Sequence, residues 1–174
     1  MTLLVFRWIW GVVGGRWSRL AAFLPTPSRL ARALRGRADA RDAIGHGPLG
    51  SLSVWAFLLL LSLQVATGLV ADDDAGTTGP LNAHVSGHLA RRASGWHAGW
   101  GADLLMALIA LHVLAIGWYT LRKREPLLRA MWTGDKPLPP DTPASADGAG
   151  RRVLALAIWS AAAGLAWLLL RWAG

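Results

Sequence analysis

Three long runs of apolar residues stand out along the 174-residue chain. They extend from about Pro48 to Ala71, from Trp96 to Leu121 and from Val153 to Trp172, and each contains 20 residues or more. An α-helix of about 20 residues is long enough to cross a bilayer. Because apolar residues cover all sides of these runs rather than one stripe, the pattern predicts transmembrane helices and not surface helices of a soluble protein.

The N-terminal segment has a different pattern. It is apolar only as far as Gly15, and this stretch already contains Arg7. About 14 residues are too few to span a bilayer. We therefore expect residues 1–15 to be the last two-thirds of a transmembrane helix whose beginning is absent. Together, the four segments predict an all-α fold, a transmembrane helical bundle.

The composition agrees with a membrane protein and narrows the chemistry. Apolar residues make up 53% of the chain and charged residues 16%, against about 45–50% and 25% in globular proteins. The chain contains no cysteine. This excludes disulfides, iron–sulfur clusters, thiolate zinc sites, a cysteine nucleophile and the covalent attachment of a c-type haem. Histidine is the remaining soft ligand.

The net charge of +8 is explained by basic residues concentrated in the connections on one side of the membrane. Of the 18 basic residues, 14 lie in two connections, residues 16–46 and 122–152, whereas the connection after Ala71 carries Asp72, Asp73 and Asp74. By the positive-inside rule, the basic connections are cytoplasmic and the Asp-rich one is periplasmic. The basic charge therefore gives no reason to expect nucleic-acid binding.

The connections suggest three parts of the chain. Residues 1–132 form a membrane domain, residues 133–150 are rich in proline, glycine and alanine and predict a flexible cytoplasmic linker, and residues 151–174 form a C-terminal transmembrane helix. Within the first part, residues 28–42 are either a basic helix on anionic lipid headgroups, with Ser28 as its N-cap, or a solvated linker.

Five histidines remain as candidates for chemistry. His112 is the single ionisable residue between Leu104 and Tyr119, and such a group inside a membrane helix indicates a functional site. Without cysteine, haem iron is its most plausible partner, and the alternative is a histidine hydrogen-bonded to a neighbouring helix. His97 lies 15 residues earlier, which is within about 60° of the same helix face and about 22 Å away along the axis. One helix could thus hold two stacked cofactors.

Several short motifs occur in an order that resembles a known family. The chain resembles the bacterial cytochrome b561 family, in particular its nickel–iron-hydrogenase b-type cytochrome branch, over roughly residues 3–137. The motifs are GHGPLG at residues 45–50, LQVATGL at 63–69, DDD at 72–74, GPL at 79–81, ALIALHVLA at 107–115 and MWTGDK at 131–136.

The resemblance implies a four-helix core with two b-type haems in bis-histidine ligation. His97 and His112 match the two ligands of the family's fourth helix, although their spacing is one residue longer than is usual. His46 matches a histidine at the mouth of the third helix, near the cytoplasmic haem or a quinone site, and its alternative is a simple helix-start residue. The family's first helix would lie upstream of this chain, so we expect a truncated core plus one extra C-terminal helix.

Arg7 and the two loop histidines complete the candidate list. Arg7 is at a depth similar to that of His112 and could pair with a propionate of the haem that His112 holds, or it could snorkel to the membrane surface. His84 and His88 match no family ligand and are expected to face solvent, with service as a substitute ligand as the alternative.

The function expected from the resemblance is electron transfer rather than stand-alone catalysis. The chain would be a multi-pass protein of the bacterial inner membrane that is embedded in lipid and carries haem b, with a homodimer as one option for its assembly. It would pass electrons between quinone and a periplasmic redox partner such as a hydrogenase or a c-type cytochrome. The alternative is a haem-poor or degenerate membrane anchor or assembly subunit of a respiratory complex. A transporter is disfavoured because no inverted repeat or broken helix is visible.

Overall fold

The computed structural model describes residues 1–37, 45–73, 76–124, 127–134 and 140–173. Over these residues the chain is helical and forms no β-strand, apart from one isolated bridge between Asp72 and Thr78. The predicted all-α fold is therefore confirmed. Some residues with expected roles lie outside the described ranges, namely Arg41 and Lys136 among the basic residues, Asp74, and part of the linker and its preceding motif (residues 135–139).

Three helical segments are long and apolar enough to cross a membrane. They are α3 (Pro48–Val70), the continuous stretch Gly87–Leu121, and α7 (Ala149–Ala173). The middle one consists of α4 (Gly87–Gly95), a π-helical turn (Trp96–Trp100) and α5 (Gly101–Leu121). Shorter helices are α1 (Thr2–Val13), α2 (Pro27–Leu34) and α6 (Leu127–Thr133), and 3₁₀ turns cover Arg16–Ser18, Leu20–Phe23 and Asn82–His84.

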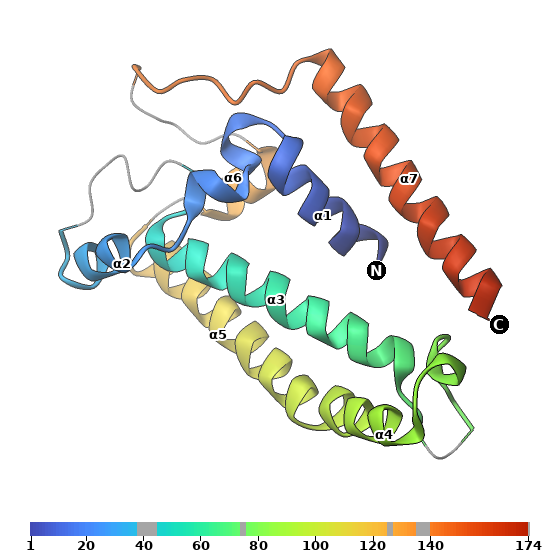
Figure 1. The fold of residues 1–174 in the computed structure, drawn as a ribbon. Coiled ribbons are helices and arrows are strands. Elements are labelled where there is room, and N and C mark those ends of the chain that lie inside the picture. The colour runs from blue at the N-terminus through green and yellow to red at the C-terminus, as the bar shows by residue number, and fades with distance from the viewer. Residues whose placement is uncertain (38–44, 74–75, 125–126, 135–139, 174) are drawn as a thin grey trace.

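Neighbouring long helices run in alternating directions (Figure 1). The connections from α1 to α3 and from α5 to α7 lie at one end of the bundle, and the connection from α3 to α4 lies at the other end with both chain termini. At that second end, the His84 ring stacks on Trp172 near the end of α7, with ring centroids 4.7 Å apart. The two basic connections thus share one end of the helices, as the positive-inside rule requires.

The described helices form two packed pairs, α3 with α5 and α1 with α7. A small apolar core made of Leu20, Phe23 and Leu58 joins the segment after α1 to α3. On α1, the indole Nε1 of Trp8 donates to the Ser62 hydroxyl of α3 at 2.9 Å. Many other large apolar side chains on α5 and α7 are exposed, which is the expected arrangement for helices that face lipid.

The end of α1 is held by the segment that leads into α7. Arg151 donates to the carbonyl oxygens of Val13 and Gly14. Just before it, the Ser145 carbonyl accepts from the Arg16 backbone N–H at 2.9 Å, and the Pro143 carbonyl accepts from the Trp17 indole at 3.0 Å. The last helix is therefore attached to the first by main-chain and side-chain hydrogen bonds.

Two predicted helix starts are wrong. The helix of the second span begins at Gly87 and not at Trp96, because the Ser86 hydroxyl accepts the Leu89 backbone N–H at 3.3 Å and caps it nine residues earlier. Residues 87–95 were not included in the predicted span because Arg91 and Arg92 interrupt the apolar sequence there. The basic helix α2 has Thr26 as its N-cap rather than Ser28, since a proline occupies the first helical position, and it already ends at Leu34.

Candidate functional site

His112 lies on α5 with its ring directed at α3. Its Nδ1 is 3.2 Å from the Ser53 hydroxyl oxygen, and its ring meets the Phe57 ring edge-on, with centroids 5.3 Å apart and an interplanar angle of 84°. The side chain is half-buried. Both of its contacts come from the first half of α3, so the orientation of the ring is set by that helix.

His97 lies in the π-helical turn and also contacts α3. Its Nδ1 is 3.0 Å from the backbone carbonyl oxygen of Gln64 and 3.5 Å from the Thr67 hydroxyl. The ring lies directly over Gly68, where a Cβ atom would be 2.7 Å from Cε1 of the imidazole. Only a glycine at this position leaves room for the ring to reach the backbone of α3.

The π-helical turn was not predicted from the sequence. Within it, the Gly101 N–H donates to the carbonyl of Trp96, five residues earlier, and Gly99 has non-helical backbone angles (φ −101°, ψ −115°). A π turn accommodates one residue more than an α-helical turn. The turn thus includes His97 and precedes His112 along the chain, and both rings contact the same neighbouring helix.

Arg7 and His46 are brought together at a different place, around the buried ring of Phe23. The Arg7 guanidinium lies 5.7 Å from the centroid of that ring and donates to the Ser18 carbonyl at 3.1 Å. The exposed His46 ring lies 5.0 Å from the same centroid. The described contacts of Arg7 are thus with the segment that follows α1 and not with His112.

The two loop histidines are exposed, as expected from their positions. The His84 ring stacks on Trp172 with an interplanar angle of 12°. His88 lies in the first turn of α4. Within the described part of the chain, neither ring contacts His97 or His112.

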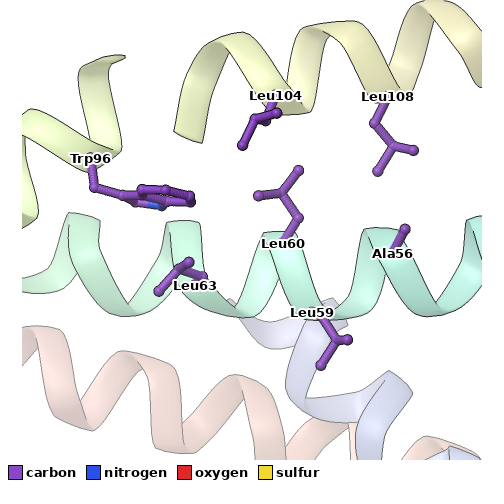
Figure 2. A pocket seen from close by; sticks show the side chains of 7 residues that line it. All are labelled: Ala56, Leu59, Leu60, Leu63, Trp96, Leu104 and Leu108. Atoms are coloured by element: carbon purple, nitrogen blue, oxygen red, sulfur yellow. The ribbon is translucent and has the colours of Figure 1, made fainter. Parts of the chain in front are cut away.

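A shallow apolar groove of about 410 Å³ lies between α3 and α5 (Figure 2). The side chains that line it are Ala56, Leu59, Leu60, Leu63, Trp96, Leu104 and Leu108. A second groove of about 660 Å³ continues toward α4 and includes Thr67 and Arg92. Neither groove is lined by a histidine, so the imidazoles and the grooves are separate features of this surface.

Comparison with known protein families identifies the family of this chain. The family model for prokaryotic cytochrome b561 matches residues 1–134. The chain belongs to this family. The match covers every described helix except α7, which follows it. No curated protein and no solved structure matches the chain. As a b561-type cytochrome with three helices able to cross a membrane, it is a multi-pass protein of a prokaryotic membrane, and its family implies haem b and electron transfer.

The residues present fit a b-type haem. A haem brings four nitrogen ligands of its own and needs only axial ligands from the protein. In this b561-type cytochrome the Nδ1 atoms of His97 and His112 contact α3, and within the described chain neither Nε2 makes a hydrogen bond. Both ring nitrogens of His97 lie close to Gly68, where an added Cβ atom would be 3.1 Å from Nδ1 and 3.2 Å from Nε2. An imidazole held through Nδ1 offers its Nε2 lone pair to iron.

Proposed function

We propose that His97 and His112 each supply one axial ligand to a b-type haem, so that one helical stretch holds two haems at different depths in the membrane. Through them the protein passes electrons between quinone and a periplasmic redox partner such as a hydrogenase or a c-type cytochrome. One observation carries the proposal: both imidazoles are held through Nδ1 by the same helix, α3, with Nε2 left without a hydrogen bond.

The protein's part in this function is to orient the imidazoles and exclude water. The Gln64 carbonyl can only accept, so a neutral His97 carries its proton on Nδ1 and leaves Nε2 unprotonated. Ser53 and Phe57, both on α3, orient the His112 ring. When bound, the haem supplies reversible one-electron chemistry, and the surrounding apolar helices provide the low-dielectric environment that tunes its potential.

The Arg7 and His46 cluster is where we propose that anionic and quinone groups bind. A guanidinium has five N–H donors, and the Ser18 carbonyl takes one of them, which leaves Arg7 able to pair with a haem propionate. His46 is exposed at the start of α3, beside the same phenylalanine ring. Both residues lie at the end of the bundle that we assign to the cytoplasm.

The experiment is a dithionite-reduced minus air-oxidised spectrum of membranes that contain the protein, combined with haem content per polypeptide. We expect His97→Ala and His112→Ala each to remove about half of the haem, since each removes an axial ligand of a different haem. His84→Ala and His88→Ala are the matched controls, because these side chains are exposed and outside the proposed sites.

Unchanged haem in both His97→Ala and His112→Ala would refute the ligand assignment. A wild-type protein that is inserted but shows no reduced b-type band would instead support the alternative function, a haem-poor membrane anchor or assembly subunit. The control variants must retain wild-type spectra for either conclusion.

A further inference from the structure

Gln64 is a buried polar residue in the middle of a membrane-spanning helix. Only 9% of its surface is exposed, and it lies in the apolar stretch of α3. Its side-chain oxygen Oε1 has no hydrogen-bond partner within the described residues. Burying an amide in such a place costs free energy unless it forms hydrogen bonds. The hydrogen bonds of Gln64 therefore show which part of the protein it holds in place.

The contacts of Gln64 converge on His97. Its side-chain Nε2 donates to the backbone carbonyl of His97 at 3.1 Å. Its own backbone carbonyl accepts from Nδ1 of the His97 ring at 3.0 Å. One residue of α3 therefore holds both the main chain and the ring of His97.

The first of these bonds replaces a hydrogen bond that the π turn removes. In an uninterrupted α-helix the Gly101 N–H would donate to the His97 carbonyl, four residues earlier. Here it donates to the Trp96 carbonyl instead, five residues earlier. The Gln64 amide supplies a donor to the His97 carbonyl in place of the Gly101 N–H.

Two glycines give this arrangement the space it needs. At Gly68, an added Cβ atom would meet the His97 ring at 2.7 Å. At Gly101, it would collide with Oε1 of Gln64 and would lie 2.6 Å from Nε1 of Trp96. The ring and the amide are thus both seated against backbone that carries no side chain.

We propose that Gln64 is the positioning residue of His97. Its side-chain amide stabilises the π turn, and the turn holds the His97 ring where Nδ1 meets the backbone carbonyl of residue 64, so that Nε2 is the nitrogen presented to haem iron. This inference rests on the proposed ligation by His97, but the clamp itself is a property of the protein and can be tested without measuring electron transfer.

The test is Gln64→Leu, which removes the amide and keeps a side chain of similar size. The full chain, labelled with ¹⁵N-histidine and reconstituted in lipid vesicles, is examined by NMR, and His97→Gln identifies the His97 signals. We expect one Nδ1-protonated form in the wild type and a mixture of two tautomers in Gln64→Leu. In the haem-loaded protein we expect the midpoint potential of only one haem to shift. Ser62→Ala is the matched control, since it removes a polar group from the same helix without touching His97.

A single Nδ1-protonated His97 in Gln64→Leu, with both potentials unchanged, would overturn the proposal. If Gln64→Leu does not insert, Gln64→Asn keeps the amide but withdraws it by one methylene, and the same loss of a single tautomer is expected. The two proposals fail separately. Full haem in His97→Ala would overturn the ligation, whereas the tautomer measurement would still decide whether Gln64 positions the ring.

Discussion

Gly68→Ala is the substitution that most directly tests the position of His97. The new Cβ atom would lie 2.7 Å from Cε1 of the ring, and ordinary contact begins near 3.4 Å, so the ring must retreat by about 0.7 Å. A retreat of this size away from α3 would lengthen the 3.0 Å contact between Nδ1 and the Gln64 carbonyl to about 3.7 Å, which is beyond a hydrogen bond.

The expected result is selective loss of one haem. Overpacking of this kind costs about 1–3 kcal/mol, which corresponds to a 5- to 150-fold weaker association. We expect the haem that we propose His97 holds to be lost or to shift in potential, while the spectrum of the haem proposed for His112 stays unchanged. Haem content per polypeptide and a redox titration of the purified protein measure both effects.

Gly50→Ala is the control for this experiment, because Gly50 lies on the same helix and its added Cβ atom would meet nothing within 4 Å. The control is expected to match the wild type. If Gly68→Ala also keeps wild-type haem content and both wild-type potentials, the His97 ring does not lie against α3, and the reasoning from its contacts is refuted.

The remaining predictions concern topology and packing. Reporter fusions at Gly76 and Gly148 are expected to be active in opposite compartments, because these residues lie in connections at opposite ends of the helices; activity in the same compartment would contradict the topology. Gly11→Ala is expected to destabilise the protein by about 1–3 kcal/mol through overpacking, since its Cβ atom would lie 2.6 Å from Cγ of the buried Leu20. Thermal denaturation in detergent measures this, with Gly164→Ala, which has open space, as the control; equal stability of the two variants would count against the packing.

Hydropathy predicted the spans because their sequence is apolar on every side of the helix. It could not predict where a helix begins when a polar N-cap residue sets that start. The run from Pro48 predicted α3 to within one residue. The same criterion missed the first nine residues of the next helix, where Arg91 and Arg92 lower the hydropathy although Ser86 caps the helix. Local capping chemistry, and not hydropathy, decides where such a helix begins.

The site was only partly visible in the sequence because its key bonds involve backbone atoms of distant residues. An isolated histidine in an apolar run identified His112 as a candidate without any structure. The Gln64 clamp could not be predicted in the same way, since its two bonds to His97 join residues 33 positions apart, and both use a main-chain carbonyl. A periodicity of 3.6 residues per turn also contains no indication of a π turn.

The attachment of α7 to α1 has a consequence for the order of assembly. The contacts made by Arg151 and by the Pro143 carbonyl join residues 126 to 138 positions apart in the chain. Within this chain α7 is translated after α1 and packs against it, and contacts of such long range form late because a large loop must close first. The packing of α3 against the π turn and α5, which carry His97 and His112, can form before α7 is translated, whereas the contacts between α1 and α7 form only afterwards.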